Sequence, residues 1–257
     1  MSESNIRYEV KEGVATLTLA RPEKKNALTV KMYDDLVARL SEADTDKAAR
    51  VIVVRADGDA FTSGNDLKDF MNAPPAGPDS SVFQLLLKLL DLETPIVAEV
   101  NGLAVGIGTT MLFHFDLVYA ARRARFQMPF VNLGLCPEGG SSFLLPRIMG
   151  MAKASELLLF GDPFSAEDAE RAGLVTRVFD DDQLEAEVAA RAKGLVERPA
   201  ASLRATKQLL RADVKERVRE AMLREGAAFV ERLGSPEAAE AFTAFFEKRK
   251  PDFSKFE

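Results

Sequence analysis

Three glycine-containing stretches hold most of the groups that could do chemistry. They are Phe61-Thr-Ser-Gly-Asn-Asp-Leu67, Asn101-Gly-Leu-Ala-Val-Gly-Ile-Gly108 and Asn132-Leu-Gly-Leu-Cys-Pro-Glu-Gly-Gly-Ser-Ser142. Glycine lets a ligand approach the main chain closely, and a helix N-terminus presents unpaired N–H groups with a partial positive charge. The first two stretches could each supply one such donor. Two donors that converge on one oxygen form an oxyanion hole, which stabilises negative charge developing on a carbonyl oxygen.

The glycine pattern alone leaves an alternative open. Residues 101–108 match neither the dinucleotide-binding fingerprint nor the phosphate-binding loop with its lysine. A Gly-x-Gly at the start of a helix also occurs where that helix packs tightly against its neighbours. Tight packing and an oxyanion site are therefore both compatible with this stretch.

Glu138 is the acidic residue of the third stretch, between a proline and a glycine pair. It could act as a general acid or base, or it could favour the start of the next helix through the helix dipole. Cys136 is flanked by leucine and proline and is expected to be a small buried side chain. His114 lies in an apolar run and is expected to be a hydrogen-bonded core residue. Residues 141–142 are serines without a nearby histidine, which argues against a Ser-His-Asp triad.

The elements that position these residues alternate between strands and helices. Two strands are expected within residues 6–20, joined at Glu12-Gly13, and Thr29 and Ser165 are expected to cap helices. Further strands are expected at 51–55, 96–100, 117–120, 124–127 and 175–178, and further helices at 80–91, 106–114, from 141 onward, at 183–197, at 200–232 and from Pro236. This alternation predicts an α/β architecture with short parallel strands.

The last sixty or so residues show no strand signal. Their helices carry apolar residues that need burial against the core or against a neighbouring subunit. These residues are Leu209, Leu210, Val218, Phe229, Val230, Phe242 and Phe245. The proline-rich segment 74–78 is expected to be a mobile connector.

Composition excludes several classes of protein. The net charge of −6 over 257 residues argues against a nucleic-acid surface, which requires a basic face. One cysteine and one histidine leave few ligands for a transition metal, so no metal site is expected. No run of apolar residues is long enough to span a membrane, and neither end of the chain resembles a targeting signal. We expect a cytoplasmic protein without nucleic-acid or membrane partners.

In this order and spacing, the three stretches resemble the crotonase (enoyl-CoA hydratase/isomerase) superfamily, and the resemblance covers almost the whole chain. Residues 21–28, Arg-Pro-Glu-Lys-Lys-Asn-Ala-Leu, are similar to the loop that holds the adenine and phosphates of coenzyme A. Residues 160–175 are similar to a later signature, and residues 246–253 to a C-terminal CoA-contacting helix. The resemblance implies a ββα spiral core over residues 1–198. It also implies a helical trimerisation region over 199–257, and so a homotrimer or a dimer of trimers.

The resemblance also assigns site residues. It places the oxyanion donors on the backbone N–H groups of Asn65 and Ile107. The implied contacts with coenzyme A are Lys24, Lys25, Ala27, Ser63, Asp66, Leu67, Lys248 and Lys250. The implied acyl pocket contains Phe70, Met71, Phe130 and Leu135. Coenzyme A is then part of the substrate, and no separate cofactor is expected.

The departures from the family pattern bear on the reaction. Hydratases of the family use two glutamates, and the corresponding positions here are Thr110 and Phe130, which cannot transfer a proton as a carboxylate does. Glu138 lies in a Pro-Glu-Gly-x-Ser-Ser run similar to that of the peroxisomal-type Δ3-Δ2-enoyl-CoA isomerases of fatty acid β-oxidation. The resemblance therefore implies a one-acid isomerase. Ring-epoxide acyl-CoA isomerisation, thioester hydrolysis and non-catalytic CoA binding remain alternatives.

Overall fold

The structure is a computed structural model that describes residues 4–256. Residues 1–3 and 257, which belong to the ends inspected for targeting signals, lie outside it.

The strands form two sheets. The larger sheet has the order β1-β2-β3-β5-β7-β10 and the smaller one β4-β6-β8-β9. The strands are β1 (Ile6–Lys11), β2 (Val14–Leu19), β3 (Val51–Ala56), β4 (Ala60–Thr62), β5 (Ile96–Val100), β6 (Leu103–Val105), β7 (Leu117–Ala121), β8 (Arg125–Gln127), β9 (Phe164–Ser165) and β10 (Arg177–Phe179).

A strand pair repeats along the chain. β3, β5 and β7 of the larger sheet are each followed, after a short turn, by β4, β6 and β8 of the smaller sheet. Within the larger sheet only β1 and β2 are antiparallel, and the other described neighbours run parallel. Each parallel step returns through helical or irregular connections, so the chain advances as a ββα spiral. The expected α/β class and spiral core are confirmed.

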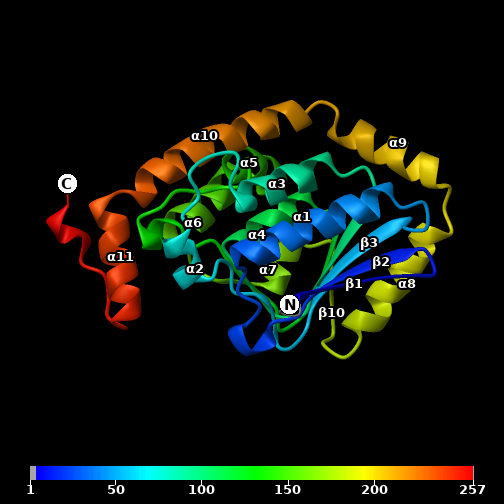
Figure 1. The fold of residues 1–257 in the computed structure, drawn as a ribbon, viewed down its shortest axis with the longest axis horizontal. Coiled ribbons are helices and arrows are strands. Elements are labelled where there is room, and N and C mark those ends of the chain that lie inside the picture. The colour runs from blue at the N-terminus through cyan, green and yellow to red at the C-terminus, as the bar shows by residue number, and fades with distance from the viewer. Residues whose placement is uncertain (1–3, 257) are drawn as a thin grey trace.

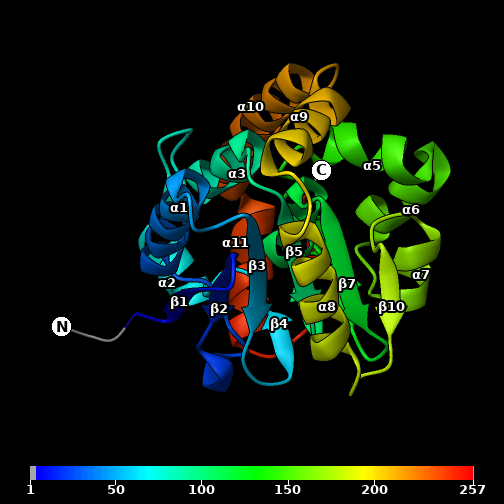
Figure 2. The same ribbon diagram turned by 90° about the vertical axis from the view of Figure 1, so that its right-hand side faces the viewer.

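Both faces of the larger sheet are covered, because side chains along a strand alternate between faces. Val51 and Val53 of β3 pack in a cluster with helix α8 (Leu184–Val196), whereas Ile52 and Val54 face the main core. Figure 2 shows α8 lying across one face of β3, β5 and β7. This explains why residues 51–54 of β3 form a continuous apolar run without polar alternation.

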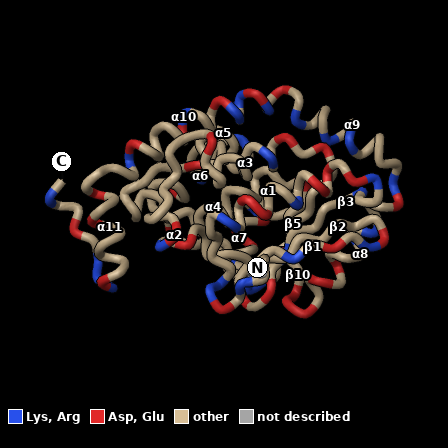
Figure 3. The backbone as a smooth tube through the Cα atoms, in the orientation of Figure 1, with Lys and Arg blue, Asp and Glu red and all other residues tan. Residues whose placement is uncertain are grey.

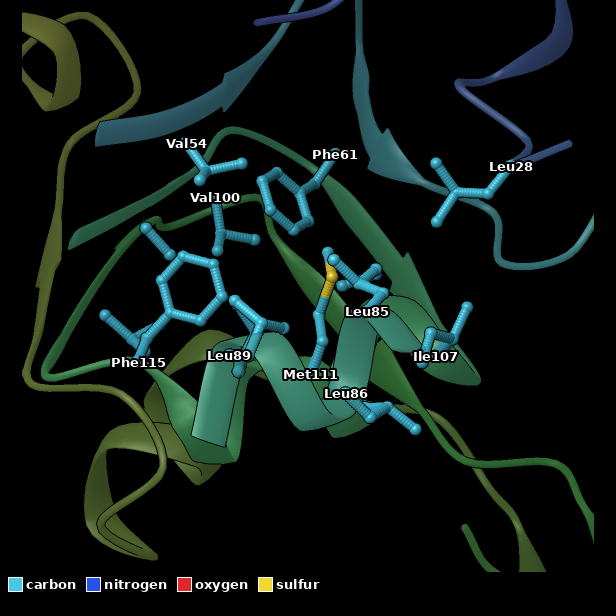
Figure 4. Packing of buried hydrophobic residues seen from close by; sticks show 14 of the residues in the cluster. Leu28, Val54, Phe61, Leu85, Leu86, Leu89, Val100, Ile107, Met111 and Phe115 are labelled. Carbon is cyan, nitrogen blue, oxygen red and sulfur yellow. The ribbon is translucent and has the colours of Figure 1, made fainter. Parts of the chain in front are cut away.

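The main core lies between the two sheets and the helices that pack on the face opposite α8. One of these helices is α3 (Ser81–Asp91), which buries leucines at helical spacing against the core. Figure 4 shows Phe61 of β4, Leu85 of α3 and Met111 in the middle of this packing, with Ile107 at its edge. Since the turns that carry the candidate donors border this core, their backbones are held by packing on one side.

The helices follow the expected pattern with three differences, one of which is a short helix at Leu67–Asn72 that the sequence did not predict. The remaining helices are α1 (Val30–Thr45), α2 (Leu67–Asn72), α4 (Ile107–Thr110), α5 (Ser141–Met149), α6 (Met151–Phe160), α7 (Ala166–Arg171), α9 (Ala200–Arg211), α10 (Lys215–Leu233) and α11 (Pro236–Phe246), with 3-10 turns at Pro22–Lys24, Met111–His114, Val131–Leu133 and Phe253–Lys255. Thr29 caps α1 through Met32 N, and Ser165 caps α7 in a reciprocal capping box, as predicted. The expected helix 106–114 becomes a short α4 followed by a 3-10 turn, and the expected run 200–232 breaks between α9 and α10.

The C-terminal helices lie outside the sheets. Figure 1 shows α10 running along the molecule over α3 and α5, with α9 at one end and α11 at the other. Val218, Phe229 and Phe242 are buried as expected, whereas Leu209 and Leu210 are both 78% exposed in the single chain. Figure 3 shows charges of both signs interspersed along α10, whereas the charged residues of α9 are all basic. No helix between residues 4 and 256 is both long enough and apolar enough to cross a bilayer.

Candidate active site

Glu138 lies in a tight loop that leads into α5. Gly139 and Gly140 both have positive φ, 71° and 79°, a conformation that an L side chain rarely adopts. Ser141 closes the turn by donating from its N–H and its hydroxyl to the carbonyl oxygen of Glu138. Nε2 of His114 lies 2.8 Å from the carbonyl oxygen of Gly139. These contacts fix the backbone on both sides of the acid.

The Glu138 side chain faces a pocket and is otherwise surrounded by protein. The hydroxyl of Thr110 donates to its Oε1 over 2.5 Å. Burial raises the pKa of Glu138 to about 7, against the opposing effect of the Thr110 hydrogen bond, and the negative charge of Glu225 adds to the rise. A carboxyl group with this pKa can accept and return a proton near neutral pH.

The two predicted donor segments are packed against each other. A Cβ on Gly64 (φ 88°) would lie 2.8 Å from the carbonyl oxygen of Val105, so only glycine allows this approach. Asn65 then follows Gly64, and Ile107 begins α4 two residues after Val105. Among the described residues, none accepts a hydrogen bond from the N–H of Asn65 or from that of Ile107. The structure thus brings two free donors to neighbouring turns.

Tyr33 is a contact that sequence reasoning missed. Its hydroxyl donates to the side-chain oxygen of Asn65, from helix α1. Burial raises the pKa of Tyr33 well above its usual value, and the nearby carboxylates of Glu138 and Asp69 add to that effect. A neutral phenol therefore fixes the Asn65 side chain, next to the N–H that we predict as a donor.

A pocket of about 330 Å³ opens in front of Glu138 and Asn65. Its wall is mainly apolar and comes from α2, α3, α10 and the segment 75–80. The main contributors are Phe70, Pro75, Pro78, Val82, Phe83, Leu86, Met222, Gly226, Phe229 and Val230. The proline-rich segment, expected to be only a connector, thus forms part of the wall. Such a pocket suits an apolar acyl group, with a few polar groups at one end.

The four residues predicted for the acyl pocket are placed differently from one another. Phe70 lines the pocket. Phe130 is buried behind the wall, where its ring meets that of Phe229 edge-on at 6.4 Å. Leu135 is buried beside a separate hollow formed with Arg232, and Met71 is 51% exposed. Met71, Phe130 and Leu135 are therefore not among the described residues that line the pocket, and the apolar surface near Glu138 comes mainly from α3 and α10.

Residues 21–28 and 63–67, the two N-terminal segments predicted to contact coenzyme A, are joined by an ion pair and hydrogen bonds. Arg21 pairs with Asp66 at 2.8 Å and donates to the carbonyl oxygen of Ala27 at 2.9 Å. The N–H of Ser63 donates to the carbonyl oxygen of Lys25. Asp66 also caps α2, which begins at Leu67. Lys24 and Lys25 are exposed at the edge of this assembly.

The two C-terminal lysines lie on the exposed segment that follows α11. Lys248 has a positive φ of 55°, and the carbonyl oxygen of Lys250 accepts from Arg249. Arg249 pairs with Glu240 of α11, which folds the segment back on that helix. Among the residues that the structure describes, no hydrogen bond or ion pair joins these lysines to Lys24 or Lys25, so their shared role stays a prediction.

Glu225 is the second buried carboxylate near the loop, and sequence reasoning did not identify it. It extends from α10 and accepts from the N–H groups of Gly140 and Ser142 at 2.6 and 2.7 Å. The signal was present in the chain, because Val218, Met222, Glu225 and Phe229 form one buried stripe on α10. A charged residue in such a stripe requires partners of its own.

The other nucleophile and metal candidates have structural roles. His114 is buried and its pKa falls to about 4 because of desolvation, so the ring is neutral and serves the Gly139 contact, as predicted for a core histidine. Burial raises the pKa of the Cys136 thiol, which disfavours the nucleophilic thiolate. Between residues 4 and 256 no three His, Cys, Asp or Glu side chains are grouped to hold a metal ion.

Comparison with known proteins places these features in one family. The enoyl-CoA hydratase/isomerase family matches residues 9–255. Enoyl-CoA delta isomerase 2 of Rattus norvegicus is 39% identical over 93% of this chain, which spans only 62% of that protein's length. The 1,2-epoxyphenylacetyl-CoA isomerase of Escherichia coli is 34% identical over 97% of this chain and 98% of its own. A crystal structure of enoyl-CoA hydratase/isomerase from Pseudoalteromonas atlantica superposes with a TM-score of 0.92 at 44% identity, covering 97% of this chain and 99% of the other. The chain therefore belongs to the enoyl-CoA hydratase/isomerase family, the crotonase superfamily that its motifs resemble.

Proposed function

We propose that this protein is a Δ3-Δ2-enoyl-CoA isomerase, which moves the double bond of a 3-enoyl-CoA thioester to the 2-trans position. One observation carries the proposal: Glu138 is the only ionisable side chain among the described residues that line the pocket. Hydration of a double bond in this family needs a second carboxylate, whereas a 1,3-proton shift needs one group that takes and returns the same proton.

Each part of the site has a role in the proposed reaction. The thioester carbonyl oxygen accepts from the N–H groups of Asn65 and Ile107. Glu138 removes a proton from C2, and the electron pair of that C–H bond forms the C1–C2 double bond of a dienolate while the carbonyl π pair moves onto the oxygen that the two donors face. Protonated Glu138 then delivers the proton to C4: the carbonyl re-forms, the C1–C2 π pair becomes the C2–C3 double bond, and the former C3–C4 π pair forms the new C4–H bond. Glu138 ends the cycle as a carboxylate, as it began.

Three features of the site favour proton return over side reactions. Thr110 engages only Oε1 of Glu138, and within the described structure no partner is recorded for Oε2, which can therefore face the substrate. The pKa of about 7 makes the protonated acid a competent donor at neutral pH. The apolar wall excludes water from the dienolate.

The test is a panel of 3-enoyl-CoA thioesters of graded chain length, followed at the absorbance of the conjugated product. We expect isomerisation of 3-enoyl-CoA and negligible hydration of crotonyl-CoA. Hydration at a rate comparable with isomerisation would contradict the assignment, because no second carboxylate is available in the pocket to support it.

Isomerisation of a ring-epoxide acyl-CoA is a second candidate. It is favoured by the match to the Escherichia coli epoxyphenylacetyl-CoA isomerase over nearly the full length of both chains. The phenyl rings of Phe70, Phe83 and Phe229 in the pocket wall could also accommodate an aromatic acyl group. The same panel, extended to an epoxidised phenylacetyl-CoA, decides between the two by comparison of kcat/KM.

A further inference from the structure

Glu225 is a buried carboxylate that the proposed proton shift does not use. Its side chain lies on the buried face of α10, between Met222 and Phe229, which line the pocket. Burying a charge in such a stripe is costly unless it is fully hydrogen-bonded. The hydrogen-bond partners of Glu225 indicate the role of its charge.

The three hydrogen bonds that the Glu225 carboxylate accepts all come from the start of α5, the helix that follows the loop of Glu138 (the acid loop). Its Oε2 accepts from the N–H of Gly140 at 2.6 Å. Its Oε1 accepts from the N–H of Ser142 at 2.7 Å and from the Ser142 hydroxyl at 2.5 Å. The N-cap residue of α5 is Gly140, which has no side chain with which to cap the helix. Glu225 therefore supplies that cap from another helix.

The contacts favour the ionised form of Glu225. Burial raises its pKa, but each of its three partners is a donor, which stabilises a carboxylate rather than a carboxyl group. Arg224, its neighbour on α10, adds a positive charge that lowers the pKa. A negative charge is thus fixed by the residues that immediately follow Glu138.

The other groups that face Glu138 are neutral near pH 7. Tyr33 from α1 and Cys136 from the same loop have pKa values raised by burial, and His114 has a pKa lowered by burial to about 4. Thr110 from α4 is uncharged and donates a hydrogen bond. Among the described groups around Glu138, Glu225 therefore carries the charge that acts on it.

We propose that Glu225 is a positioning residue for Glu138: it holds the acid loop against the pocket from the opposite helix, and its negative charge strengthens Glu138 as a base. The predicted effect on kcat rests on the proposed isomerase function, whereas the predicted effect on the Glu138 pKa does not. Glu225 touches no reacting atom in this arrangement and acts only through the loop.

The first experiment compares Glu225→Gln with Glu220→Gln, an exposed glutamate of the same helix. Gln at 225 loses the charge and offers only one acceptor to the two N–H groups. We expect kcat to fall by up to about 10²-fold, the cost of a small misplacement of a catalytic group, with KM changed less. The midpoint of the pH–rate profile should move to lower pH, because removing a nearby negative charge lowers the pKa of Glu138. Glu220→Gln should match wild type in both.

The second experiment titrates the Glu138 carboxyl carbon by ¹³C NMR, with the resonance assigned from its loss in Glu138→Gln. Its pKa should be lower in Glu225→Gln than in wild type. This titration stands even if no 3-enoyl-CoA is isomerised, so failure of the proposed function is distinguished from failure of this inference. If Glu225→Gln loses thermal stability but Glu138 titrates as in wild type, Glu225 is only structural and the proposal is overturned.

A milder variant covers the case in which Glu225→Gln does not fold. Ser142→Ala removes the hydroxyl donor and leaves the backbone N–H contacts in place. It should lower kcat by a smaller factor than Glu225→Gln, because the loop loses one of its three contacts with the carboxylate. The Glu138 pKa should not fall as it does in Glu225→Gln, because the charge of Glu225 stays in place. An unchanged kcat in a folded Ser142→Ala variant would reject the proposal.

Discussion

At the scale of single residues, the proposed chemistry depends on Glu138. Its replacement by Gln keeps the size and the acceptor for the Thr110 hydroxyl, but it cannot take a proton. We expect kcat to fall by about 10²–10⁴-fold, the usual contribution of a positioned acid or base. The backbone donors of Asn65 and Ile107 remain, so acyl-CoA binding should persist. Stopped-flow isomerisation and exchange of the C2 protons with D₂O should decline together, and a folded variant within a few fold of wild type would contradict the mechanism.

The raised pKa of Glu138 also affects stability. The group titrates near 4.5 when unfolded and at about 7 in the fold, so the folded protein binds the proton more tightly. The resulting stabilisation is complete below the unfolded pKa and is lost as the pH rises through the folded pKa. Gln cannot ionise, and Glu138→Gln should therefore gain stability relative to wild type as the pH is raised from about 4 to about 8.5. Urea unfolding at both values tests this, and an equal difference at the two pH values would contradict it.

The lysines assigned to coenzyme A remain a prediction at this scale. Lys25→Glu and Lys248→Glu should weaken CoA binding at low ionic strength by roughly 1 kcal/mol or less each, since exposed charges contribute little. The difference should shrink as salt is added. Lys47→Glu, at an exposed position outside the predicted site, is the control. Calorimetry at two ionic strengths measures the effect, and affinities that match the control at low salt would remove these lysines from the site.

At the scale of elements, local signals were predictable and long-range ones were not. The caps at Thr29 and Ser165 are hydrogen bonds to residues only three positions further along the chain, so a short stretch of sequence contains both partners. The contact of Glu225 with Gly140 spans 85 residues, and no local pattern pairs them. The family resemblance predicted Phe130 in the acyl pocket, but the wall is formed mainly by α3 and α10, whose positions depend on the whole fold.

Helix breaks show the same limit. The periodicity of 200–232 is continuous, yet the helix breaks between α9 and α10. Within α9, Lys207 forms a buried pair with Asp116 at 2.8 Å. Lys207 also donates to the carbonyl oxygen of Thr94 at 2.9 Å, so α9 is anchored to the core by a lysine. Helical spacing of apolar residues predicts which face is buried, but it does not identify such an anchor.

The contact between α3 and α10 predicts how activity depends on the length of the acyl chain. A Cβ on Gly226 would lie 3.0 Å from the Phe83 ring, so this glycine keeps the wall open. Gly226→Leu should fill part of the pocket and lower kcat/KM for long acyl chains relative to short ones by about 10-fold, the equivalent of two buried methylene groups. Gly194→Leu is the matched control, because nothing lies within 4 Å of a Cβ at that position in α8. An unchanged length profile would show that the acyl chain does not pass between α3 and α10.

At the scale of the whole molecule, the exposed apolar side chains predict association. Leu209 and Leu210 on α9 and Leu159 and Phe160 on α6 are at least 66% exposed in the single chain. A monomeric soluble protein rarely leaves such groups uncovered. We expect a trimer or a dimer of trimers in light scattering, and Leu209→Asp combined with Leu210→Asp should shift the mass toward the monomer. A well-folded monomer of the wild-type chain at micromolar concentration would contradict this expectation.

The placement of Glu225 on α10 has a consequence for how this enzyme can diverge. The same helix turn carries Met222 and Gly226, which shape the pocket, and the carboxylate that caps α5. A substitution that shifts α10 to admit a bulkier substrate should also displace the loop of Glu138, because Glu225 of α10 is hydrogen-bonded to Gly140 and Ser142. We therefore expect substrate range and acid strength to be genetically coupled, so that variants selected for new acyl groups accumulate compensating changes within residues 139–142. Deep mutational scanning on two substrates would reveal this coupling as epistasis between the two segments.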